Sequence, residues 1–163
     1  MKRILITLLS VVLLLSLISC NTQKYRDDQA VAELAGKAVT ALNDGVTYLP
    51  ADSGYLSDYL TKPDYVTEEI IFFATETNNL NEFGIFHVQD GNAEAMKELL
   101  KGYLKQSLEK NQTWYDSYIP EETPKLRDAE VQVYGNYVVY AIMGTDDRAT
   151  LFDSIKDTLS TDN

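Results

Sequence analysis

The chain has 163 residues, with 14 Lys and Arg against 25 Asp and Glu, and a formal net charge of −11. This charge repels nucleic acid and anionic lipid headgroups, so the composition argues against a nucleic-acid-binding protein and against a domain that lies on a bilayer. One cysteine and one histidine argue against a disulfide framework and a zinc site.

The N-terminal residues predict where the protein works. Two basic residues precede an apolar run over residues 4–18, which is shorter than the roughly 20 residues that span a bilayer. The run ends in Leu17-Ile18-Ser19-Cys20, with leucine at −3 and a small serine at −1. We therefore expect residues 1–19 to be a lipoprotein signal peptide and the Cys20 thiol to be lipidated. The alternative is an uncleaved membrane helix with an incidental cysteine.

Lipidation at Cys20 would make the bilayer a partner of the protein. Two acyl chains hold a protein stably at a membrane, which places it on the extracytoplasmic face of the cell membrane. Residues 20–27 are predicted to be the lipid anchor and a short polar tether, and residues 21–27 reach at most about 25 Å. Residues 28–163 suit a single domain with a sizeable core.

The first part of this domain is predicted to be helical. Apolar residues recur at helical spacing from Val31 to Leu42, and Asn43-Asp44-Gly45 ends the helix. Residues 46–54 form a predicted loop. A short helix is expected over residues 55–60, ended by Pro63.

Two β-hairpins, each followed by a helix, are predicted for the rest of the domain. The β-rich segments cover residues 69–75, 83–89, 129–134 and 137–143. Gly135-Asn136 separates the last two and is a strong signal for a tight turn. Apolar helix faces follow over residues 93–108 and 149–159.

This order predicts an α+β fold. We expect an antiparallel sheet of about four strands in ββα-ββα order, with an N-terminal helix. The helices are expected to pack mainly on one face of the sheet. The other face would then stay partly open for a partner.

The sequence predicts no catalytic, cofactor-binding or metal-ligating residue. Asp52-Ser53-Gly54 resembles the nucleophile segment of trypsin-like proteases, but a serine nucleophile needs a base. The only histidine, His87, falls inside a predicted strand. Adjacent acidic pairs occur at residues 68–69, 121–122 and 146–147, and no pattern among them selects the facing pair that a glycosidase requires.

Eleven tyrosines are many for a chain of this length. Tyrosine often lies half-buried with its hydroxyl in water, so these residues either rim the core or form a contact surface. The predicted partner-contact residues are Trp114, Tyr115, Tyr118, Tyr134, Tyr137 and Tyr140.

Three segments carry a resemblance to a known family. They are Glu82-Phe83-Gly84-Ile85-Phe86 leading to Asp90, Tyr118-Ile119-Pro120-Glu121, and Gly135-Asn136-Tyr137-Val138. With them, roughly residues 30–160 resemble small lipoproteins of Gram-positive anaerobes that are classed as a domain of unknown function. The resemblance implies a lipoprotein context and no catalytic or binding residue.

The sequence leaves several functions open. We expect a non-catalytic, membrane-anchored interaction module whose partner is an envelope protein or a wall component. The alternative is a cell-envelope enzyme that acts on wall sugar or peptide through carboxylates, and a pocket gathering several acids with raised pKa would favour it. A third possibility is a small-ligand sensor, which needs a closed apolar pocket.

Overall fold

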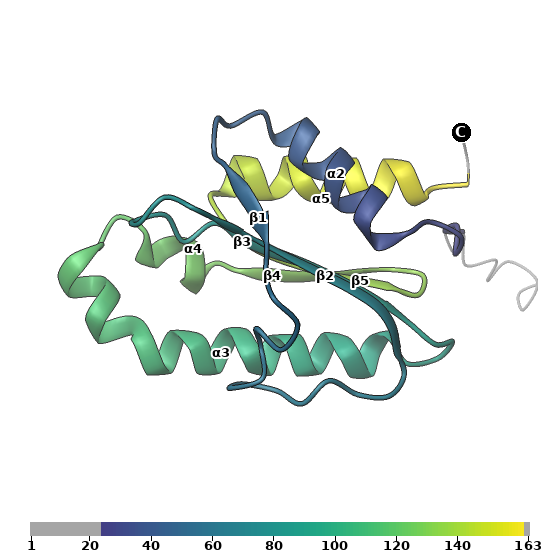
Figure 1. The fold of residues 1–163 in the computed structure, drawn as a ribbon, viewed down its shortest axis with the longest axis horizontal. Coiled ribbons are helices and arrows are strands. Elements are labelled where there is room, and N and C mark those ends of the chain that lie inside the picture. The colour runs from purple at the N-terminus through teal and green to yellow at the C-terminus, as the bar shows by residue number, and fades with distance from the viewer. Residues whose placement is uncertain (1–23, 162–163) are drawn as a thin grey trace, which may run out of the picture.

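The computed structural model describes residues 24–161, which form an antiparallel sheet between two layers of helices (Figure 1). The predicted signal peptide at residues 1–19 and the predicted lipidation site Cys20 lie outside the described residues. None of the helices between residues 24 and 161 is long and apolar enough to cross a membrane.

The observed elements confirm the α+β class and both predicted hairpins. In chain order they are α2 (Val31–Leu42), β1 (Tyr48–Pro50), β2 (Val66–Ala74), β3 (Glu82–Val88), α3 (Ala93–Tyr118), α4 (Thr123–Arg127), β4 (Glu130–Tyr134), β5 (Tyr137–Ile142) and α5 (Thr145–Leu159). The strand order is β1-β2-β3-β5-β4, and all neighbouring strands are antiparallel.

Two segments before β2 differ from the prediction. The segment predicted as a loop over residues 46–54 contains β1, a short strand that pairs with the end of β2. The segment predicted as a helix over residues 55–60 forms successive turns instead, with backbone hydrogen bonds such as Ser57 N to Gly54 O at 2.8 Å.

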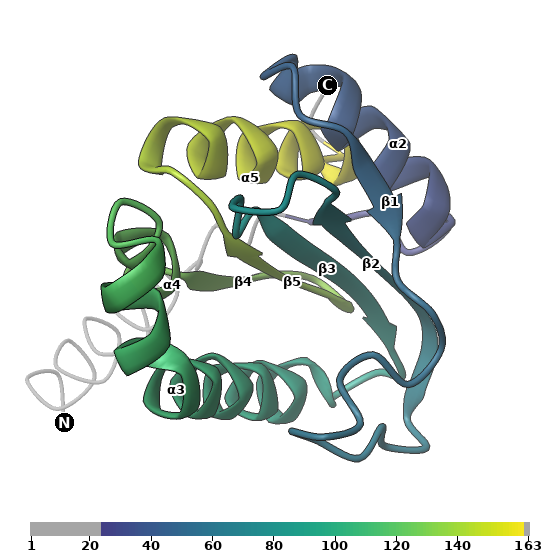
Figure 2. The ribbon, with the colours of Figure 1, turned by 60° about the vertical axis from the view of Figure 1, so that its left-hand side comes forward.

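The helices cover both faces of the sheet, so the prediction that they pack mainly on one face is wrong. Helices α2 and α5 enclose one hydrophobic core against the sheet, and α3 and α4 enclose a second core on the opposite face. Figures 1 and 2 show the strands between these two helical layers.

The composition of β5 explains why both faces are covered. Val139 and Ala141 point into the α2/α5 core, whereas Val138 and Tyr140 point into the α3 core. All six residues of β5 are buried. A strand that is apolar on both faces requires cover on both, which removes the open face predicted for a partner.

The first described residues belong to the domain rather than to a free tether. Arg26 N donates a hydrogen bond to Leu159 O at 2.7 Å, and Tyr25 forms a β-bridge with Ser160. The Tyr25 ring also packs edge-on against Tyr134, with 5.5 Å between ring centroids. The domain therefore begins by residue 24 and not at residue 28. In Figure 1 this end lies on the right, and α3 ends on the left.

Candidate functional site

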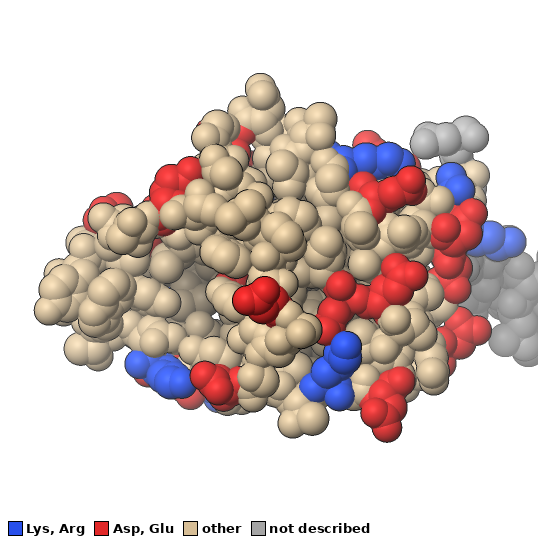
Figure 3. Space-filling model, viewed as in Figure 1, with Lys and Arg blue, Asp and Glu red and all other residues tan. Residues whose placement is uncertain are grey.

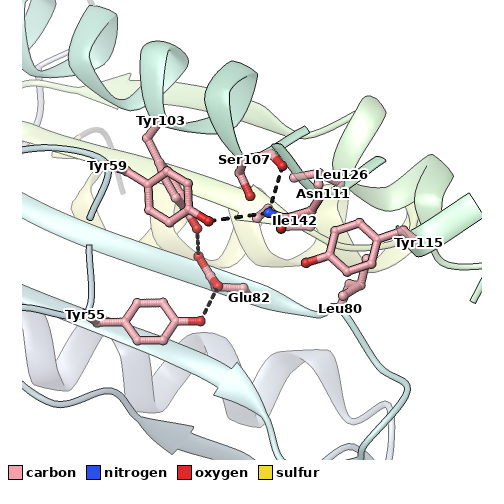
Figure 4. A pocket seen from close by; sticks show the side chains of 10 residues that line it. All are labelled: Tyr55, Tyr59, Leu80, Glu82, Tyr103, Ser107, Asn111, Tyr115, Leu126 and Ile142. Carbon is pink, nitrogen blue, oxygen red and sulfur yellow. Dashed lines mark hydrogen bonds between the residues drawn. The ribbon is translucent and has the colours of Figure 1, made fainter. Parts of the chain in front are cut away.

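A buried carboxyl group forms the centre of the candidate site. Glu82 opens β3 and is only 8% exposed. Its Oε1 accepts hydrogen bonds from the hydroxyls of Tyr103 and Tyr140, both at 2.6 Å. Its Oε2 accepts one from the Tyr55 hydroxyl at 2.8 Å (Figure 4). The three tyrosines come from α3, β5 and the turns before β2.

A glycine makes room for one of these tyrosines. Tyr140 lies opposite Gly84 in the register of β3 and β5. A Cβ atom on Gly84 would meet the Tyr140 ring at a separation that Cβ atoms essentially never show. The ring therefore lies over the bare backbone of β3. From there the Tyr140 hydroxyl reaches Glu82, which lies two residues before Gly84 and therefore on the same face of β3.

The environment of Glu82 acts on its protonation in opposite directions. Burial raises the pKa of the Glu82 carboxyl above its usual value, and the hydrogen bonds from Tyr103, Tyr140 and Tyr55 counteract part of this rise. Burial, followed by the nearby Glu82 charge, raises the pKa of all three tyrosines. They therefore remain hydroxyl donors at neutral pH.

A cavity of about 210 Å³ opens beside Glu82. It is lined by Tyr55, Tyr59, Leu80, Glu82, Tyr103, Ser107, Asn111, Tyr115, Leu126 and Ile142. Figure 3 shows a hollow with uncharged walls in the left half of this face, where Figure 1 places the C-terminal part of α3.

Two hydroxyl groups point into this cavity without a protein partner. They belong to Tyr115 and Ser107 (Figure 4). Neither hydroxyl forms a hydrogen bond with any residue in the range 24–161. Ser107 is only 7% exposed. Because both hydroxyls border the cavity, each can form a hydrogen bond with a ligand or with water there.

An exposed aromatic pair lies next to the cavity wall. Trp114 is 52% exposed, and its ring packs edge-on against Tyr115 at 5.4 Å between centroids. Its other neighbour is Tyr118, which is 70% exposed and stacked at 5.1 Å. Because Trp114 and Tyr118 are four residues apart on α3, they share one face of the helix.

The structure divides the six predicted contact residues into two groups. Trp114 and Tyr118 are exposed, and Tyr115 lines the cavity. The prediction is wrong for three buried residues, Tyr134, Tyr137 and Tyr140. Their hydroxyls bond within the protein, to Phe152 O, to the Gln29 backbone and to Glu82. They are buried because helices cover both faces of the sheet.

Sequence reasoning missed Glu82, Tyr55, Tyr59 and Tyr103. An acidic residue that opens an apolar strand was the available signal in Glu82-Phe83-Gly84-Ile85-Phe86. Its partners could not be read from this signal, because they follow from strand register and from the path of the turns.

The only histidine takes part in a separate polar arrangement. His87 Nε2 lies 2.9 Å from Asp27 Oδ1, and Nδ1 lies 2.6 Å from Thr67 Oγ1. Thr67 Oγ1 also lies 3.0 Å from His87 O, and the tautomer of the ring decides which of the two acceptors takes the Thr67 proton. This geometry ties the N-terminal segment to the sheet through Asp27, His87 and Thr67.

A comparison with protein families gives one match. The family model described as Domain of unknown function (DUF4358) matches residues 57–143. The matched segment contains Glu82, Tyr103 and Tyr140, and Tyr55 lies two residues before it. No curated protein and no solved structure matches the chain.

The contact between Gly84 and Tyr140 predicts the effect of a single methyl group. Gly84→Ala should reduce the free energy of unfolding by about 1–3 kcal/mol, because the added Cβ forces the Tyr140 ring away from β3. Urea unfolding of the full chain in detergent, followed by circular dichroism, measures this change.

The matched control is Gly102→Ala within α3. A Cβ at Gly102 meets no atom within 4 Å, and alanine is favoured over glycine in a helix by about 0.8–1 kcal/mol. This variant should be at least as stable as the wild type. Equal stability of Gly84→Ala and Gly102→Ala would contradict the packing described for Tyr140.

Proposed function

The chain belongs to the DUF4358 family, whose function is unknown, and we propose that it is a membrane-anchored binding module that holds a small molecule in the Glu82 cavity. The observation that carries this proposal is the cavity itself. One buried carboxyl and the unpartnered hydroxyls of Tyr115 and Ser107 converge on a space of about 210 Å³. Convergent polar groups in an aromatic-walled pocket are typical of a small-molecule site.

Binding is better supported than carbohydrate hydrolysis. Among the residues that line the cavity, Glu82 alone carries a carboxyl group. Glycosidases commonly need two carboxyl groups that face each other across the scissile bond. Catalytic acids also have a raised pKa, as Glu82 does. However, three tyrosine hydroxyls donate hydrogen bonds to the Glu82 carboxyl and hold it in a fixed position.

The proposed location is the extracytoplasmic face of the cell membrane, with lipid on Cys20. Because Lys24 already contacts the domain through Thr161, a chain of four residues from Cys20 reaches at most about 14 Å. The chain enters the domain at the end opposite to the end of α3 in Figure 1. In this proposal the cavity therefore faces away from the bilayer and towards the envelope.

The exposed pair of Trp114 and Tyr118 is the proposed contact surface for an envelope protein or a wall component. Large aromatic side chains supply much of the binding energy at interfaces. This pair lies beside the cavity, so a bound partner would also cover its wall.

If Cys20 carries the lipid anchor, substitution of this residue should abolish labelling of the protein with palmitate. In a bacterium that processes lipoproteins, the wild type should incorporate labelled palmitate, fractionate with membranes and lose residues 1–19. Cys20→Ala should lose the label, since the chain has no other cysteine. Ser19→Ala keeps a small residue before the cleavage site and should keep the label. Incorporation of the label into Cys20→Ala would rule out this anchor. Mass analysis of the N-terminus shows whether the leader has been cleaved or remains as a membrane helix.

The cavity predicts that ligand binding depends on free space at Ser107. Small polar compounds that raise the thermal midpoint of the full chain in detergent should lose this effect in Ser107→Leu, because the larger side chain fills the cavity. Ser117→Leu, on the exposed surface of the same helix, should retain it. Ligands that stabilise all three proteins equally would place the binding site elsewhere.

A further inference from the structure

We propose that the ligand of the Glu82 cavity carries a protonated amine, which donates an N–H hydrogen bond to Glu82 Oε2 and packs against the surrounding tyrosine rings. This inference rests on the proposed function and names the chemical class of its ligand. It follows from three properties of the cavity, which are a carboxyl without a cationic partner, a free acceptor position and aromatic walls.

The first property is a buried carboxyl without a counterion. Within residues 24–161, Glu82 forms no ion pair with a lysine or arginine, and its hydrogen bonds come from tyrosine hydroxyls. A buried charge is costly unless it is paired. A cation that enters the cavity would provide this missing pair, whereas an anionic ligand would be repelled.

The second property is an open acceptor position. A carboxylate has about four lone-pair sites, two on each oxygen. Glu82 Oε1 accepts from both Tyr103 and Tyr140, and Oε2 accepts only from Tyr55. One site on Oε2 therefore remains for a donor, and Glu82 is among the residues that line the cavity.

The third property is the aromatic wall. Tyr59, Tyr103 and Tyr115 line the space next to Glu82, and cations are attracted to the faces of such rings. The molecule already contains one example, because Lys110 Nζ lies 4.8 Å from the centroid of the Tyr59 ring. Lys110 is not among the residues that line the Glu82 cavity.

The remaining polar groups also fit an ammonium group. A primary ammonium has three N–H donors, and Glu82 can accept one of them. The free hydroxyls of Ser107 and Tyr115 point into the same space (Figure 4) and have lone pairs for the others. The cavity of about 210 Å³ limits the bound part to a small aliphatic amine.

Calorimetric titration of the full chain in detergent tests this inference with two probes of matched shape, propylammonium and propan-1-ol. Propylammonium should bind and should shift the fluorescence of Trp114, the only tryptophan, whose ring contacts Tyr115. Propan-1-ol should bind at least about ten-fold more weakly, because a charge-assisted hydrogen bond contributes more than a neutral one.

Two substitutions separate the cavity from the general negative charge. Glu82→Gln should weaken propylammonium binding by about ten-fold or more. Its amide oxygen can still accept from Tyr103 and Tyr140. Glu109→Gln removes one charge from the exposed surface of α3 and should change the affinity by no more than about two-fold at physiological salt.

If circular dichroism shows that Glu82→Gln does not fold, a second variant still tests the inference. Tyr115→Leu removes a ring and a hydroxyl from the cavity and should also weaken amine binding, whereas Ser117→Leu should not. Equal affinities for the amine and the alcohol would overturn the amine assignment while leaving a binding cavity. Full amine affinity in the cavity variants would overturn it as well, because the amine would then bind outside the cavity. If no small compound binds the wild type, the proposed function fails as well.

Discussion

The Glu82 carboxyl is the interaction on which the α3 side of the fold depends. Its two oxygens accept hydrogen bonds from Tyr55, Tyr103 and Tyr140, which join the turns before β2 to α3 and to β5. A buried acid without donors would be strongly destabilising, so these contacts constrain all three segments together. The same arrangement leaves a cavity and one acceptor position on Glu82. The hydrogen bonds of Glu82 therefore both order these three segments and shape the proposed binding site.

The two faces of the sheet differ in chemistry. Neighbouring residues of β3 show the contrast, because Phe83 is fully buried in the apolar α2/α5 core while Glu82 lies in the polar cluster on the α3 side. The α2/α5 side also holds the incoming chain, through the contact of Arg26 with Leu159. The α3 side carries the cavity and the exposed aromatic pair. Both layers enclose a hydrophobic core, and we propose that attachment belongs to the α2/α5 side and binding to the α3 side.

Local signals in the sequence predicted most elements, because periodicity and the Gly135-Asn136 turn are local properties. They missed β1, whose three residues include a proline at the sheet edge. The hairpin order suggested helices mainly on one face, although the continuous apolar run of β5 is typical of a strand that is buried on both. The site depends on contacts between residues that are 21 to 58 positions apart, and no pattern in one sequence specifies them. Lipidation of Cys20 remains a prediction.

The buried state of Glu82 is tested by the pKa of its carboxyl in the full chain, measured from the pH dependence of the carboxyl carbon-13 resonance. We expect a midpoint above the ordinary glutamate value of about 4.3, since burial outweighs the three tyrosine hydrogen bonds. We also expect that saturating propylammonium lowers this midpoint, because a bound cation favours the charged carboxylate. A midpoint at or below the ordinary value without the amine would show that burial does not dominate at Glu82, and would contradict the uncompensated buried carboxyl on which the amine proposal rests.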